Sequence, residues 1–164
     1  ATFIARETGA EVRYATLALA GYWTAIMVGR LAAAKLLNYI RDAHLVAASG
    51  AAAALATGLL LVAETPAAAA AAAWLIGLSY AAIYPTTLGM AGDRFPRFAG
   101  TMFGVLFSIA LIGGMSFPWA AGHLSEAAGL RAGLAIPLAG AAGVTLLALV
   151  ILRVVPGPSA GQQP

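Results

Sequence analysis

The chain alternates between long apolar segments and short polar ones. Two of the apolar segments, residues 65–92 and 98–125, carry no formal charge when His123 is counted as neutral. A helix needs about 20 apolar residues to cross the hydrocarbon core of a membrane. We therefore predict an all-α membrane protein with five transmembrane helices, which span roughly residues 14–34, 45–63, 67–92, 98–121 and 132–152.

The polar segments predict how these helices are oriented. Residues 1–13 are expected to form an extracytoplasmic loop, and residues 154–164, rich in Pro, Gly, Ser and Gln, a disordered cytoplasmic tail. Cytoplasmic loops carry an excess of Lys and Arg. We expect an integral protein of the bacterial inner membrane with a cytoplasmic C-terminus. The alternate loops carry six basic residues on the inner side (Arg30, Lys35, Arg41, Arg94, Arg97 and Arg153) and three on the outer side (Arg6, Arg13 and Arg131).

The start of the chain is unusual for a complete protein with this orientation. Ala1 would lie outside the cell, although no signal peptide precedes the first span and the first methionine is Met27. We expect the chain to be the downstream part of a longer protein whose missing spans lie upstream.

Composition excludes several classes of protein. Of the 164 residues, 62% are hydrophobic and 9% are charged, and the mean hydropathy is +0.89, so the solvent around most of the chain is lipid. The basic residues form no stripe, and we predict no nucleic-acid partner. With no cysteine, and with His44 and His123 on opposite membrane faces, we predict no metal site and no cofactor. Ser79 lies in a helix rather than a strand-turn motif, so we predict no catalytic residue and no enzyme.

Aromatic and hydroxyl side chains are sorted among the spans. The second and fifth spans contain no aromatic residue, whereas the first, third and fourth contain several. Helices that line a watery cavity need hydroxyls and amphipathic rings, whereas lipid-facing helices do not. We predict that these three spans line a cavity and that the other two lie outside them. The cavity candidates are Tyr22, Trp23, Tyr80, Tyr84, Thr87, Phe107 and Ser108.

Two of these candidates have an alternative role. Gly77, Tyr80, Tyr84 and Thr87 share one face of a continuous helix, which suits a neutral polyol stacked on the rings. Tyr80 and Tyr84 could instead pack helix against helix. Trp74 and Trp119, near span ends, are better explained as members of an interfacial aromatic belt.

Glycine, proline and charged residues predict packing and conformational features. Pro85 should kink the third span near Ala81. We expect four glycines to mediate close helix packing: Gly77, Gly100, Gly104 and Gly114. Four charged residues could form a cytoplasmic charge latch, although Arg30 alone could instead be a flanking residue that reaches the interface: Arg30, Asp42, Asp93 and Arg94.

The order of several short motifs resembles the C-terminal half of a major facilitator superfamily transporter. These motifs are Gly29-Arg30, Gly77-Leu78-Ser79, Ile83-Tyr84-Pro85-Thr86-Thr87, Gly92-Asp93-Arg94-Phe95-Pro96 and Ala99-Gly100-Thr101 with Gly104. The subgroup that the chain resembles is that of the fucose and glucose/galactose permease-like sugar:proton symporters. The resemblance implies that the five spans are helices eight to twelve of a twelve-helix fold, and that a six-helix N-terminal bundle is the partner.

The resemblance implies a secondary transporter that moves a small solute by alternating access, with a sugar and proton symport as the expected substrate and coupling. No carboxylate lies mid-membrane in this chain, so a titrating acid is expected in the absent half. Two alternatives remain: an efflux or lipid-moving member of the superfamily, and a five-span structural or assembly subunit that transports nothing.

Overall fold

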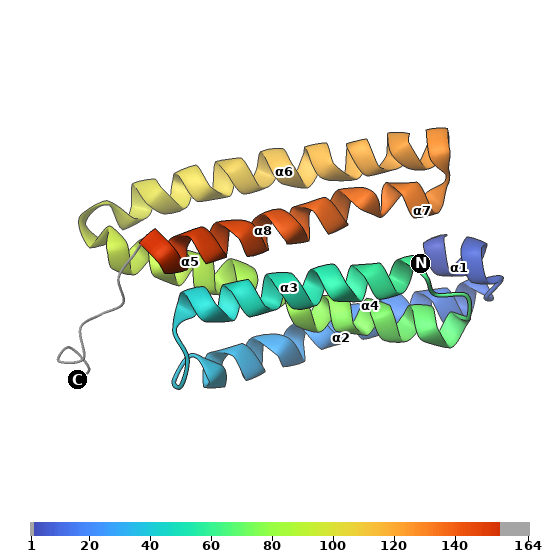
Figure 1. Cartoon of the computed structure of the whole chain (residues 1–164), viewed down its shortest axis with the longest axis horizontal. Coiled ribbons are helices and arrows are strands. Elements are labelled where there is room, and N and C mark those ends of the chain that lie inside the picture. Colours follow the sequence, from blue (N-terminus) through green and yellow to red (C-terminus); the bar gives the residue numbers. More distant parts are fainter. Residues whose placement is uncertain (1, 155–164) are drawn as a thin grey trace.

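The computed structural model describes residues 2–154, and every secondary-structure element in that range is helical (Figure 1). The helices are α1 (Thr2–Thr8), α2 (Val12–Leu36), α3 (Asp42–Leu61), α4 (Pro66–Tyr80), α5 (Ile83–Arg94), the short 3-10 helix η1 (Pro96–Phe98), α6 (Ala99–Ala128), α7 (Leu130–Gly133) and α8 (Ala135–Val154).

Five helical segments of the described chain are long and apolar enough to cross a membrane. The shortest of them, Asp42–Leu61, has 20 residues, which at about 1.5 Å per residue spans roughly 30 Å. The prediction of an all-α membrane fold with five spans is therefore confirmed. The segments are Val12–Leu36, Asp42–Leu61, Pro66–Arg94, Pro96–Ala128 and Leu130–Val154.

Two connections differ from the loops expected from the sequence. Thr2–Thr8 form the helix α1, because Ile4 is only 4% exposed and packs against the ends of α2 and α4. α6 continues through the polar residues after the fourth span and ends at Ala128. The residue that follows, Gly129, ends the helix, because its φ of 93° is a left-handed conformation that favours glycine. The tail expected at 154–164 lies outside the described residues apart from Val154, which ends α8.

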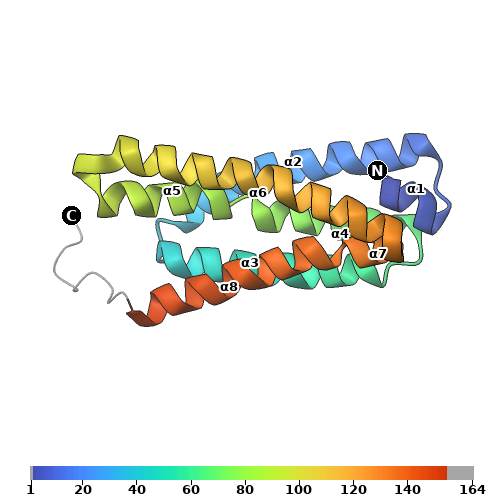
Figure 2. The same ribbon diagram turned by 90° about the horizontal axis from the view of Figure 1, so that it is seen from above.

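In Figure 2, α3 and α8 lie along one side of the bundle and α2 and α6 along the opposite side, with α4 and α5 between them. In Figure 1, α6 and α2 lie at opposite edges of the bundle. The aromatic-rich spans contact the two spans that lack aromatic residues, since α3 packs against α4 and α5, and α6 against α8. α3 is nevertheless not merely peripheral, since it contacts α4, α5 and α8 and has more buried residues than any other described helix.

The core is built from small residues. Most of the buried hydrophobic residues are alanines, and the one fully buried side chain of notable size is Thr57, whose hydroxyl donates to the Ala53 carbonyl over 2.8 Å. Small residues let helix backbones approach closely, which favours van der Waals packing in a lipid solvent. A Cβ added at Gly77 would lie 2.5 Å from the Tyr22 carbonyl oxygen, and one at Gly50 would lie 2.6 Å from Thr145 Oγ1. The α2–α4 and α3–α8 contacts therefore depend on glycine.

The third span is broken where Pro85 predicts a kink. α4 ends at Tyr80 and α5 begins at Ile83, with Ala81 and Ala82 in a turn between them. Proline has no N–H, so the Ala81 carbonyl loses the partner that a regular helix would give it. The break is enclosed, because Ala81 is 2% exposed and Gly29 of α2 faces its Cβ.

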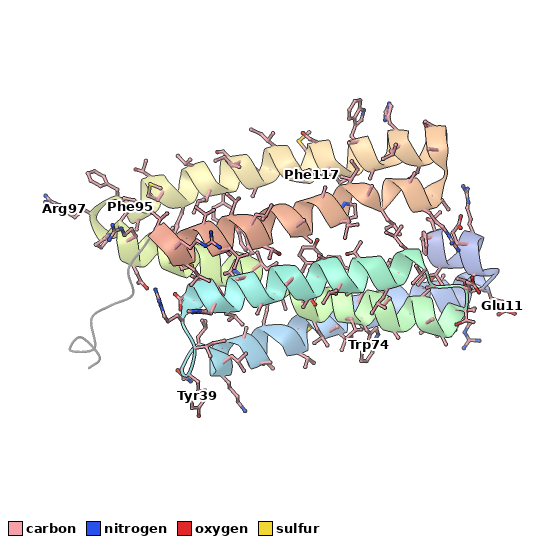
Figure 3. The ribbon with its side chains drawn as sticks, viewed as in Figure 1. Glu11, Tyr39, Trp74, Phe95, Arg97 and Phe117 are labelled. Atoms are coloured by element: carbon pink, nitrogen blue, oxygen red, sulfur yellow. The ribbon has the colours of Figure 1, made fainter. Side chains whose placement is uncertain are left out.

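The two sets of basic residues lie at opposite ends of the bundle. The α2–α3 connection, the α5–α6 connection and the last turn of α8 share one end, and α1, the α3–α4 connection and α7 share the other (Figure 1). Figure 3 shows Arg97 and Tyr39 at the first end and Glu11 at the second. Which end is cytoplasmic stays a prediction.

Candidate functional site

The strongest cluster among the cavity candidates joins α5 to α6. The rings of Tyr84 and Phe107 meet edge to face, with centroids 5.9 Å apart and an interplanar angle of 66°. Both side chains keep an open surface, since Tyr84 is 40% exposed and Phe107 is 49% exposed. Such a pair presents a fixed apolar surface with a phenol hydroxyl at its edge, which can hold the apolar face and polar rim of a small solute.

Two hydroxyls lie near these rings in the sequence and in their helices. Thr87 Oγ1 donates to the Ile83 carbonyl over 2.7 Å, and Ser108 Oγ donates to the Gly104 carbonyl over 2.9 Å. Each hydroxyl donates its hydrogen to a carbonyl of its own helix, but its oxygen can still accept a hydrogen bond. Both residues are exposed, so these acceptors are open to a solute that carries hydroxyl groups.

Tyr80 is directed elsewhere. Its phenol donates to the Pro137 carbonyl of α8 over 3.3 Å, whereas the Tyr84 ring contacts Phe107 of α6. That Tyr80 and Tyr84 share one face with Gly77 and Thr87 stays a prediction, since Ala81 and Ala82 in the turn keep right-handed helical dihedral angles. The hydrogen bond favours the packing alternative for Tyr80.

Tyr22 and Trp23 are neighbours on α2 with different surroundings. Their rings meet edge to face at 5.3 Å and 76°, but Tyr22 is half-buried against Gly77 whereas Trp23 is 59% exposed. Tyr22 therefore contributes to the α2–α4 contact. The Tyr22–Trp23 pair and the Tyr84–Phe107 pair are separate ring contacts.

A cavity of about 360 Å³ opens between the end of α2 and the start of α5. Its wall combines one guanidinium, one phenol and one threonine with apolar side chains. The lining residues are Arg30, Ala33, Ala34, Leu37, Tyr84, Pro85, Thr86 and Leu88. Tyr84 thus belongs to this cavity and to the aromatic pair at once, so the two features form one continuous site.

Thr86 is a member of this site that sequence reasoning missed. It is 4% exposed, and its Oγ1 is buried without a hydrogen-bond partner. Threonine in a helix usually donates to a carbonyl one turn earlier, as Thr87 does. A buried polar group left unpaired costs about 1–3 kcal/mol. The signal available in the sequence was the Thr86-Thr87 pair, because adjacent helical residues point in directions about 100° apart and only one can face the core.

A larger groove of about 480 Å³ lies on α4 but offers little chemistry. It is lined by apolar residues only, and the Trp74 side chain in its wall is half-exposed. The Trp74 indole covers Gly21 of α2, where an added Cβ would overlap it. This groove lacks the polar groups that fix the orientation of a solute. Its lining residues are Ala70, Ala71, Trp74, Leu75 and Leu78.

The candidate charge latch is not closed in this structure. Across residues 2–154, one ion pair is present, between Arg131 Nε and Glu7 Oε2 at 3.1 Å. It joins α1 to α7 at the other end of the bundle. The latch, formed by the two acidic and two basic candidates at the first end, stays a prediction: Arg30, Asp42, Asp93 and Arg94.

The four glycines expected at helix contacts divide into two groups. Gly77 is buried against α2. An added Cβ at Gly100, Gly104 or Gly114 would meet no atom within 4 Å. None of the described helices packs against these three glycines, so a packing role for them stays a prediction.

No metal-binding cluster occurs within residues 2–154, where no three His, Asp or Glu side chains gather. His123 interacts with a residue of its own helix. Its Nδ1 lies 3.1 Å from the Trp119 carbonyl oxygen, and the centroids of the two rings are 4.3 Å apart. The site is therefore built from aromatic, hydroxyl and guanidinium groups.

A comparison with protein families matches residues 1–164, the whole sequence, to the Major Facilitator Superfamily. The chain belongs to this family. The major facilitator superfamily consists of membrane transporters rather than enzymes, and with five membrane-spanning helices this chain is an integral membrane protein. The helical arrangement is consistent with a fragment of the superfamily fold. No curated protein and no solved structure matches the chain.

Proposed function

We propose that the chain forms one bundle of an alternating-access transporter, and that a small hydroxylated solute, a sugar, binds on the side formed by α2, α5 and α6. The observation that carries this proposal is the half-exposed Tyr84–Phe107 pair, and Thr87 in α5 and Ser108 in α6 add exposed hydroxyl acceptors to the same two helices. Transporters of this type bind their substrate between two bundles and rock the bundles around it. The second bundle is the partner this function requires.

Proton symport is the coupling that we propose. In the described spans every carboxylate lies at or near a helix end or in a connection, so the chain has no buried mid-membrane acid to carry the proton. The proposed coupling acid therefore belongs to the partner bundle. We also propose the bacterial inner membrane as the location. The end of the bundle that carries five arginines and one lysine would then lie in the cytoplasm.

The test is uptake of labelled sugar by the intact protein reconstituted in liposomes. Tyr84→Ala and Phe107→Ala remove one ring each from the pair, and we expect each to raise KM about three- to tenfold, since such a ring contact is worth about 0.5–1.5 kcal/mol. Tyr84→Phe retains the ring, so its KM should lie closer to that of the unaltered protein.

The matched control is Phe117→Ala, which removes an equally exposed ring from the same helix, α6, away from the pair. Unchanged kinetics in Tyr84→Ala and Phe107→Ala would contradict the proposed binding surface. Equal losses in all three variants would indicate that the rings serve folding rather than binding. External alkalinisation that accompanies sugar uptake would support symport, and its absence would contradict it.

A further inference from the structure

The cavity beside Tyr84 holds a charge that the proposed sugar site does not use. Arg30 is the one ionised side chain in its wall, and no Asp or Glu is among the lining residues. Across residues 2–154, the single ion pair lies elsewhere, between Arg131 and Glu7. The guanidinium therefore faces the cavity without a carboxylate partner from the described chain.

Arg30 also lies inside the span rather than at its end. α2 continues to Leu36, which at about 1.5 Å per residue places Arg30 roughly 9 Å before the helix ends. A guanidinium at such a depth is expensive unless it reaches water or meets an anion. Its planar fork of N–H donors matches the two oxygens of a carboxylate or the oxygens of a phosphate.

One hydroxyl group among the lining residues suits the same ligand. The Tyr84 phenol can donate to an anionic oxygen, and its ring is held in place by Phe107. The Thr86 hydroxyl is buried, so a ligand in the cavity does not reach it in this structure. The volume of about 360 Å³ lies in the range of small-molecule sites.

We propose that the transported solute is an anion, and that Arg30 and Tyr84 bind its carboxylate or phosphate while the Tyr84–Phe107 pair contacts its hydroxylated ring. This inference rests on the proposed function and narrows the substrate from a sugar in general to a sugar acid or sugar phosphate. Tyr84 connects the two parts of the ligand because it belongs to both the cavity and the ring pair.

The experiment compares probes that share one sugar ring and differ in charge. The intact protein in liposomes is assayed with glucose, glucuronate and glucose 6-phosphate, as wild type, Arg30→Gln and Arg30→Lys. We expect wild type to prefer at least one anion over glucose by about tenfold or more, and Arg30→Gln to remove that preference because it weakens uptake of the anion far more than uptake of glucose. Arg30→Lys should retain part of the preference, because a lysine keeps the charge and loses the fork.

Lys35→Gln is the matched control, since it removes a basic residue from the last turn of the same helix outside the cavity lining. It should leave the preference intact. Equal losses for neutral and anionic probes in Arg30→Gln would overturn the inference and assign Arg30 to a charge latch. An anion preference that survives in Arg30→Gln would overturn it as well.

A binding readout separates this inference from the proposed function. Thermal stability of the purified intact protein is measured with glucuronate, glucose 6-phosphate and anionic phosphatidylglycerol. Stabilisation by a sugar anion that disappears in Arg30→Gln supports the inference even if no probe is transported, in which case the proposed transport of sugars fails alone. The inference is overturned if only phosphatidylglycerol stabilises the protein through Arg30, or if none of the three compounds does. The proposed sugar uptake is tested separately, by the Tyr84 and Phe107 variants.

Discussion

α4 and α6 both combine glycine with aromatic residues, yet they pack in opposite ways. In α4, Gly77 is buried so closely against α2 that an added Cβ would reach 2.5 Å from the Tyr22 carbonyl. α6 has 30 residues and no buried residue, and Gly100 and Gly104 face open space. In Figure 1, α6 runs along the outer edge of the bundle, whereas α4 lies between α3 and α2.

The difference shows that a small-residue motif permits close packing but does not select a partner. Gly100 and Gly104 have the spacing that lets helices approach, and no described helix faces them. Gly77 packs because α2 presents small residues at the same level, including Ala25, whose Cβ would lie 3.1 Å from an added Cβ. Burial in this bundle therefore follows from which helices are adjacent.

The largest expected effect comes from Gly77→Ala. Its new Cβ meets a backbone oxygen, which cannot move aside as a flexible side chain could. We expect a loss of about 1–3 kcal/mol in the free energy of unfolding, because overpacking forces the α2 and α4 backbones apart. Reversible unfolding of the intact protein in mixed micelles measures this change.

Gly104→Ala is the matched substitution on α6. A Cβ there meets nothing within 4 Å, so we expect no loss and a gain of at most about 1 kcal/mol from helix propensity. If Gly104→Ala were as harmful as Gly77→Ala, the two helices would pack alike, and the contrast between them would be wrong.

The sequence predicted the features that follow from local chemistry. Uninterrupted apolar runs fix the five spans, and Pro85 removes a hydrogen-bond donor, which accounts for the break at Ala81–Ala82. The contact between Tyr84 and Phe107 agrees with the sorting of aromatic residues into three spans, although that sorting did not specify the pair.

Features that depend on the path of the chain after the break were not predictable. The sequence did not identify α8 as the neighbour of Tyr80, whose phenol donates to the Pro137 carbonyl. The role of Thr86 required knowledge of which face of α5 meets the end of α2. Periodicity gives the relative direction of side chains within one helix, but it does not identify the neighbouring helix.

Tyr80→Phe tests how the packed region is joined to α8 and should have an intermediate effect. It removes one hydrogen bond, from the phenol to the Pro137 carbonyl, and leaves the ring in place. We expect a loss of about 0.5–1.5 kcal/mol in the free energy of unfolding, with transport kinetics unchanged. The same unfolding assay measures the loss, and uptake in liposomes checks the kinetics. A raised KM without lost stability would restore Tyr80 to the binding surface.

The smallest effect is expected at the ion pair that connects the packed region to the segment after α6. Glu7 of α1 accepts from Arg131 of α7 over 3.1 Å, and both side chains are partly exposed, at 27% and 47%. Exposed pairs of this kind contribute about 0–1 kcal/mol and are screened by salt. We expect Glu7→Gln to lower the melting temperature slightly at low salt and not at high salt. Glu11→Gln, which removes a nearby carboxylate without this pair, serves as the control. A large drop in melting temperature that persists at high salt would mean that more than this ion pair holds α1 and α7 together. In that case the contact between α6 and the packed helices would be stronger than this structure indicates.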